Sequence, residues 1–165
     1  MRKTIVALTM VAGLASAACG GSEPSKGVAA PAVETEAETD LTIVATDFGF
    51  DLGGVDSVAP GEIQLTLENE GKQSHEAQLY LLNEGVTFEQ FAAAAMEGDT
   101  SRLPAEALAM ATPGGGVTSN VDPGESITVP APVEGGLYAF VCHILDSKSL
   151  SPHYALGMMA SLEVG

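Results

Sequence analysis

Short apolar segments separated by turn residues make up most of the chain from Leu41 onward. In 63–69 apolar and polar residues alternate, which is the pattern of a strand with one buried and one solvent-exposed face. Sequences such as Ala59-Pro60-Gly61 and Asp122-Pro123-Gly124 favour turns between the segments. The pattern predicts strands at 41–46, 63–69, 77–82, 117–121, 126–129, 137–142 and 159–164.

One stretch, 87–111, has a helical pattern instead. Thr87 and Gln90 have the spacing of a capping box, and 88–96 consists largely of strong helix formers. A second short helix is expected at 104–110, and the Pro-Gly-Gly-Gly at 113–116 is expected to end this region. The sequence therefore predicts an all-β fold, a Greek-key antiparallel β-sandwich with a short helical insertion.

The N-terminus has the order of an export signal. Arg2 and Lys3 precede an apolar stretch and a small-residue cleavage site, so 1–18 is predicted to be a removable signal peptide. Cys19 follows directly, as in bacterial lipoproteins, and we expect it to be lipidated; ordinary secretion is the alternative. Residues 19–40 are acidic and poor in large apolar side chains, which predicts a disordered tether. The expected location is the periplasm or the extracytoplasmic face of the cell membrane, with only the lipid anchor touching the membrane.

The chain is strongly acidic, with 22 acidic and 6 basic residues and a net charge of −16. Removal of the signal takes away Arg2 and Lys3 and no acid, so the net charge becomes −18. This balance argues against nucleic acid or an anionic membrane surface as a partner. A partner protein with a basic patch is compatible with it, and simple solubility is an equally good explanation.

Soft ligand residues gather near the C-terminus: Cys142, His153 and Met158 lie within a short stretch, and His75 lies far upstream. The chain has two cysteines, so lipidation of Cys19 leaves Cys142 without a disulfide partner. Thiolate, imidazole and thioether together are the ligand set of a mononuclear copper site. Each position also has a simpler explanation. Cys142 could be an inert buried thiol, His75 a turn residue, and His153 a solvated loop residue.

Strand alternation separates the neighbours of Cys142 into two sets. Tyr138 and Phe140 share the face of Cys142, whereas His143 points to the opposite face. We therefore interpret His143 as a surface or second-site residue and Cys142 as the member that points inward. By the same alternation Met158 faces the candidate site and Met159 faces away from it.

The spacing Tyr138-x-Phe140-x-Cys142, followed by His153 and then Gly157-Met158, resembles the C-terminal copper loop of the cupredoxin family, the plastocyanin-like blue copper proteins. The turn that leads from Asn69 to His75 is similar to the segment that carries the family's first histidine ligand. The resemblance implies a cupredoxin-like domain at 41–165 and one copper ion that alternates between Cu(I) and Cu(II). It implies a ligand set of His75, Cys142, His153 and, as the axial ligand, Met158.

Two features depart from the family pattern. The ten residues 143–152 between Cys142 and His153 form a longer loop than plastocyanin-like proteins have, which costs little closure entropy. The Cys142-His143 pair also resembles the end of multicopper oxidases, but their trinuclear cluster needs many more histidines than the three in this chain.

The sequence therefore favours a monomeric, non-enzymatic carrier of single electrons that works with a redox partner protein. Two alternatives remain open. The same ligands would serve a copper-binding protein for delivery or buffering, and the fold could be a metal-free binding module.

Overall fold

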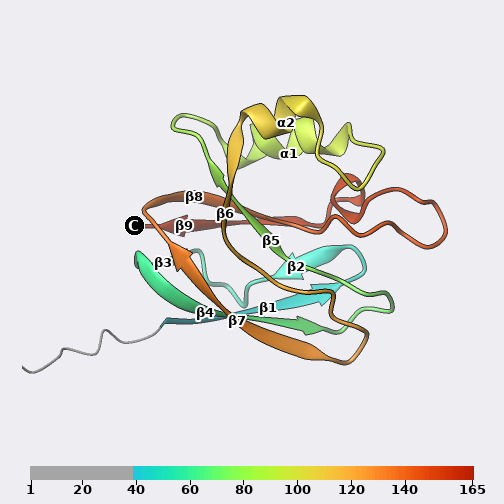
Figure 1. Cartoon of the computed structure of the whole chain (residues 1–165), viewed down its shortest axis with the longest axis horizontal. Coiled ribbons are helices and arrows are strands. Elements are labelled where there is room, and N and C mark those ends of the chain that lie inside the picture. The colour runs from blue at the N-terminus through green and yellow to red at the C-terminus, as the bar shows by residue number, and fades with distance from the viewer. Residues whose placement is uncertain (1–38) are drawn as a thin grey trace, which may run out of the picture. The chain divides into compact units, whose positions relative to one another are not determined.

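The computed structural model describes residues 39–165, which form two facing β-sheets with a helical layer outside one of them (Figure 1). The predicted signal peptide, the lipidation of Cys19 and nearly all of the predicted tether lie outside the described residues. The strands are β1 (Thr39–Thr46), β2 (Gly49–Asp51), β3 (Ser57–Val58), β4 (Gly61–Asn69), β5 (Gln78–Leu82), β6 (Ala111–Val117), β7 (Ser126–Val133), β8 (Gly136–Val141) and β9 (Met159–Val164). The helices are α1 (Phe88–Met96), α2 (Ala105–Ala109) and the 3₁₀ turn η1 (His153–Leu156).

The first sheet has the order β2-β1-β4-β7, and its alternation follows the sequence pattern. Leu41 and Ile43 of β1 and Leu65 and Leu67 of β4 are buried between the sheets. On the outer face Thr66 of β4 pairs with a threonine of β7, and their hydroxyl oxygens are 2.8 Å apart. One apolar face and one polar face therefore place this sheet as an outer wall of the sandwich.

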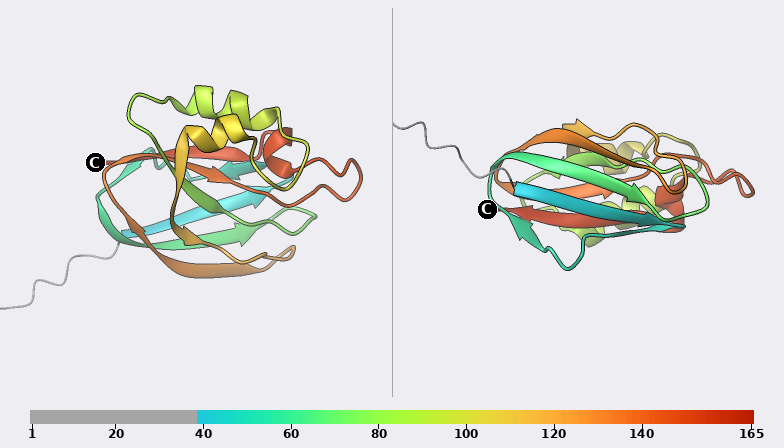
Figure 2. Two further views of the ribbon diagram at one scale, coloured as in Figure 1. Left: turned by 45° about the horizontal axis from the view of Figure 1, so that its top comes forward. Right: turned by 90° about the horizontal axis from the view of Figure 1, so that it is seen from below.

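The second sheet has the order β3-β9-β8-β5-β6, and it is covered on both faces. Tyr138, Phe140 and Cys142 face the core between the sheets, whereas Ala139 and Val141 face the helices. Figures 1 and 2 show α1 and α2 lying over this outer face. The predicted division of residues between the two faces of 137–142 is confirmed.

The sandwich prediction is confirmed, but both sheets are mixed rather than purely antiparallel. β1 runs parallel to β4, and β3 runs parallel to β9. The chain leaves the first sheet after β2, adds β3 to the second sheet and then returns, so it enters β4 in the direction of β1. Alternation in a sequence reports which face is buried but not the direction of the neighbouring strand.

The helical insertion forms between β5 and β6, as predicted. Thr87 is the N-cap of α1; its side chain accepts from the Gln90 backbone, and the Gln90 side chain accepts from the Thr87 backbone. Phe91 and Ala95 are fully buried against the outer face of the second sheet. Within residues 39–165, no helix has both the length and the apolar character needed to cross a membrane.

The predicted strand at 117–121 is wrong, and the predicted break at 113–116 is in fact part of β6. β6 is the edge strand of its sheet, so Pro113, which lacks an N–H, is tolerated there. Gly115 lies so close to β7 that a Cβ would come within 2.8 Å of the Pro132 carbonyl oxygen. The glycines that looked like a break allow β6 to approach β7. Of 117–121, Val117 is the last residue of β6 and pairs with Gln78, and Val121 makes an isolated bridge with His75.

Candidate metal centre

Two connections, β4–β5 and β8–β9, meet at one end of the sandwich and bring His75, Cys142 and His153 together. His75 lies between β4 and β5, Cys142 directly follows β8, and His153 begins η1. The imidazole Nδ1 atoms of His75 and His153 are 3.2 Å apart, and His153 Nδ1 is 3.4 Å from Cys142 Sγ. All three side chains are fully buried, and their ligand atoms lie within 4.8 Å of one another.

Backbone hydrogen bonds fix the spacing of these residues. The His75 N–H donates to the Val121 carbonyl, and the Val121 N–H donates to the His75 carbonyl. The Cys142 N–H donates to the Met158 carbonyl, and the Met158 N–H donates to the His153 carbonyl. Met158 is fully buried and belongs to the same apolar cluster as Cys142, whereas Met159 packs on the helical side. The two methionines therefore face opposite sides, as alternation predicts.

The long loop 143–152 is folded back on itself, so it brings His153 to the site. The Asp146 carboxylate accepts hydrogen bonds from the backbone N–H groups of Lys148 and Ser149 and from the Gln73 side-chain amide. These bonds, above all those of Ser149, hold the pKa of Asp146 well below its ordinary value. Leu145 and Pro152 form a bridge across the base of the loop. The loop length is thus compatible with a compact site.

Burial keeps the centre uncharged in the absence of metal. It raises the pKa of the Cys142 thiol to about 11. Burial, together with repulsion from His75, lowers the pKa of His153 to about 4. Burial also lowers the pKa of His75, although the neighbouring Asp47 opposes this effect. Both imidazoles are therefore neutral at pH 7 and keep a lone pair for a metal, and Cys142 must lose a proton to bind one.

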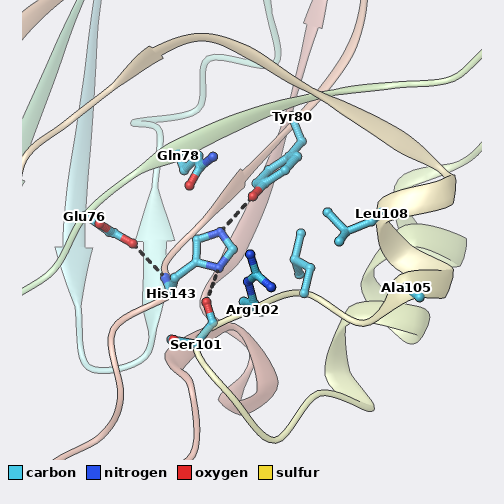
Figure 3. Close-up of a pocket in the computed structure, with 9 residues that line it drawn as sticks. Glu76, Gln78, Tyr80, Ser101, Arg102, Ala105, Leu108 and His143 are labelled. Carbon is cyan, nitrogen blue, oxygen red and sulfur yellow. Dashed lines mark hydrogen bonds between the residues drawn. The ribbon is translucent and has the colours of Figure 1, made fainter.

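His143 lies on the helical side of the sheet, as predicted, where its ring packs near those of Tyr80 and Tyr154, and it is not part of the cluster. Figure 3 shows its ring beside the Tyr80 hydroxyl and the Ser101 carbonyl. It lines a cavity of about 560 Å³ under the helical insertion, together with Glu76, Tyr80 and Arg102. Its Nδ1 donates to the Ser101 carbonyl at 3.1 Å, so its Nε2, 3.1 Å from the Tyr80 hydroxyl, accepts from that group. His143 thus connects the sheet to the insertion behind the metal site.

Sequence reasoning missed three residues around the centre. The Asp47 carboxylate lies 3.2 Å from His75 Nε2, and the Phe48 ring packs edge-on against His153 with centroids 4.9 Å apart. The Tyr154 hydroxyl donates to the carbonyl oxygens of Thr100 and Arg102, both at 2.7 Å. In the sequence, only the positions of these residues could have pointed to them. Asp47 and Phe48 follow the first strand, and Tyr154 follows a candidate ligand.

The donor set fits a copper ion. Metal bonds of about 2 Å place two nitrogen or sulfur ligands of one ion roughly 3–4 Å apart. The separations of 3.2 and 3.4 Å among His75, His153 and Cys142 match that spacing. Two imidazoles with one thiolate form the trigonal set of blue copper sites. His153 Nε2 is buried and has no hydrogen-bond partner among residues 39–165. By contrast, His75 Nε2 lies 3.2 Å from the Asp47 carboxylate.

The fold matches solved cupredoxin structures. Reduced auracyanin from the photosynthetic bacterium Roseiflexus castenholzii aligns over 79% of this chain and 99% of its own, with a TM-score of 0.50 and 24% identity. Auracyanin A from Chloroflexus aurantiacus, described as a blue copper protein, aligns over 76% of this chain and 99% of its own, with a TM-score of 0.43 and 20% identity. Reduced rusticyanin aligns over 79% of this chain and 82% of its own, with a TM-score of 0.47 and 15% identity.

No protein-family model matches the sequence, and no curated protein matches it. At 24% identity the similarity to the Roseiflexus auracyanin establishes the fold alone. The described part of the chain is a cupredoxin-like β-sandwich.

Proposed function

We propose that this protein is a mononuclear type 1 (blue) copper protein that carries single electrons. His75, Cys142 and His153 would hold the ion, with Met158 as the axial ligand. The observation that carries this proposal is the convergence of two imidazole nitrogens and one thiol sulfur in a fully buried cluster. Similarity of the fold to a cupredoxin supports it.

A bound copper ion supplies a one-electron couple, and the protein supplies a fixed and dry environment. Cys142, His153 and Met158 are joined by backbone hydrogen bonds, so their donor atoms have little freedom to rearrange. Their burial excludes water from the ligand atoms. A site that keeps one geometry in both oxidation states suits electron transfer. By contrast, an ion that is delivered elsewhere needs an exposed ligand, and all four candidate ligands are fully buried.

The cellular setting of this proposal comes from the sequence. We place the protein outside the cytoplasm, anchored by a lipid on Cys19, with a redox partner protein that presents a basic patch. The net charge of −18 after removal of the signal is compatible with such a partner, because it attracts positively charged surfaces. We propose a non-enzymatic role, because the three histidines of the chain are too few for an additional copper cluster.

Copper binding is tested by adding equimolar Cu(II) to the purified protein and recording the visible spectrum. We expect an intense thiolate-to-copper charge-transfer band that is completely lost in Cys142→Ser. His143→Gln is the matched control. It changes a histidine next to Cys142 on the opposite face of the sheet, so the band should persist.

The remaining outcomes separate the other functions. Tight binding of Cu(I) without the charge-transfer band would favour delivery or buffering of copper. Absence of bound copper at equimolar metal would contradict both copper functions and leave a metal-free binding module.

A further inference from the structure

Asp47 directly follows β1, and its carboxylate touches the side of the His75 ring that points away from the cluster. Its Oδ1 is 3.2 Å from His75 Nε2, and the same oxygen accepts the Lys72 backbone N–H at 2.9 Å. The His75 side chain is fully buried, whereas a quarter of the Asp47 side chain is exposed. The carboxylate is thus held at the surface while it contacts a buried candidate ligand.

This contact determines which nitrogen of His75 carries the hydrogen. An ionised carboxylate can only accept, so His75 Nε2 must be the donor. A neutral imidazole then has its lone pair on Nδ1. That atom is the one that faces His153 Nδ1 at 3.2 Å. Asp47 therefore selects the tautomer of His75 that can bind a metal at the cluster.

Gly71 gives independent support, because the backbone passes directly beside the contact. A Cβ at this position would lie 2.6 Å from Asp47 Oδ1 and 2.6 Å from His75 Nε2. Real Cβ atoms do not approach other atoms so closely, and any side chain would push the carboxylate and the imidazole apart. The turn after β4 is therefore shaped around the pair of Asp47 and His75.

We propose that Asp47 is a positioning residue that fixes the tautomer and orientation of His75 and, through its charge, favours Cu(II) over Cu(I). This inference rests on the proposed function, because it takes the bound ion to be copper. Carboxylates hydrogen-bonded to ligating histidines typically change metal affinity by about 10–100-fold. The nearby negative charge stabilises the more positive oxidation state, which lowers the reduction potential. His153 has no such partner among the described residues, so the support is specific to His75.

The first test is made on the metal-free wild-type protein, in which the contact between Asp47 and His75 is intact. Nitrogen-15 NMR of the imidazoles, assigned by the loss of signals in His75→Gln, should show His75 with its hydrogen on Nε2. A hydrogen on Nδ1 would overturn the proposal.

The second test compares variants in copper affinity and reduction potential. Asp47→Leu removes the acceptor, and we expect it to weaken Cu(II) binding about 10–100-fold. Asp47→Asn keeps an acceptor oxygen but loses the charge. It should therefore bind Cu(II) better than Asp47→Leu does, and its reduction potential should be higher than that of the wild type. Gly71→Ala should weaken binding although Asp47 is intact.

Asp122→Asn is the matched control. Asp122 follows Val121, which pairs with the His75 backbone, and its carboxylate accepts from the Ser74 hydroxyl without touching the His75 ring. This variant removes the same charge at the same end of the molecule and should stay within about twofold of the wild type in affinity. Equal affinities of Asp47→Leu and Asp122→Asn would overturn the proposal.

These outcomes are distinguishable from a failure of the proposed function. If the wild type binds copper without the thiolate band, the blue-copper function fails. The His75 tautomer and the affinity ratio of the variants still decide the role of Asp47.

Discussion

At the scale of single residues, burial decides how the candidate ligands behave. Cys142 and His153 are both fully inaccessible to solvent. Burial raises the pKa of the Cys142 thiol to about 11 and is the main cause that lowers the pKa of His153 to about 4. Both shifts favour the neutral form, because a charge is poorly solvated in the protein interior. The metal-free site is therefore neutral, and binding of a cation must release the Cys142 proton.

The raised pKa of Cys142 predicts how stability changes in alkali. An unfolded thiol ionises near its ordinary pKa of 9.0, whereas the folded thiol stays protonated up to about pH 11. Between these values the folded state binds more protons, so the free energy of unfolding falls as pH rises, by up to about 3 kcal/mol. Urea titrations of the metal-free protein at several pH values measure this slope. Cys142→Ser is the control, and an identical slope in the variant would contradict the prediction.

At the scale of elements, the glycines of β6 show how a strand can look like a break. Pro and Gly are poor strand formers, yet the edge position needs no N–H from Pro113. Gly115 has no room for a side chain, because its Cβ would lie 2.8 Å from both the Cγ atom and the carbonyl oxygen of Pro132. The two sheets are thereby brought together along β6 and β7.

This close approach predicts that Gly115→Ala destabilises the protein by about 1–3 kcal/mol, as overpacking usually does. The added methyl group would have to push β6 away from the Pro132 backbone. Chemical unfolding of both proteins measures the difference. Gly49→Ala is the matched control. Gly49 lies in β2, and the nearest atom to its Cβ would be the Thr46 hydroxyl oxygen at 3.6 Å, an ordinary contact distance. A loss in the control as large as in Gly115→Ala would contradict the explanation.

At the scale of the whole molecule, the net charge and the fold have different origins and different effects. The net charge of −16 does not determine the sandwich, which depends on apolar alternation. It does produce a long-range field that attracts cations and repels anions. The candidate ligands are fully buried, so this field acts mainly on molecules that approach from solvent.

The field predicts how the copper-loaded protein exchanges electrons with small reagents. A cationic metal complex should react faster than an anionic complex of similar driving force at low salt. The ratio of the two rates should fall as ionic strength rises from about 0.01 to 0.15 M, where the Debye length shortens from about 30 to 8 Å. Stopped-flow kinetics measure both rates, with a neutral complex as control. A ratio that does not change with salt would contradict this prediction.

The sequence by itself determined the sandwich class, the helical insertion and the two faces of the strand that leads to Cys142. These features follow from alternation within one segment, because each strand buries its own apolar face whatever its neighbour is. Alternation likewise placed His143 opposite Cys142, and the choice of soft side chains pointed to copper.

Only the tertiary structure decided which distant segments lie side by side. It made β1 parallel to β4, continued β6 through Gly115, and set Asp47 against His75 with Gly71 beside them. A sequence pattern reports which residues share a face within one segment. It does not report which residues far apart along the chain come into contact. The burial that shifts the pKa of Cys142 is likewise a property of everything packed around the thiol, so it exists only in the folded protein.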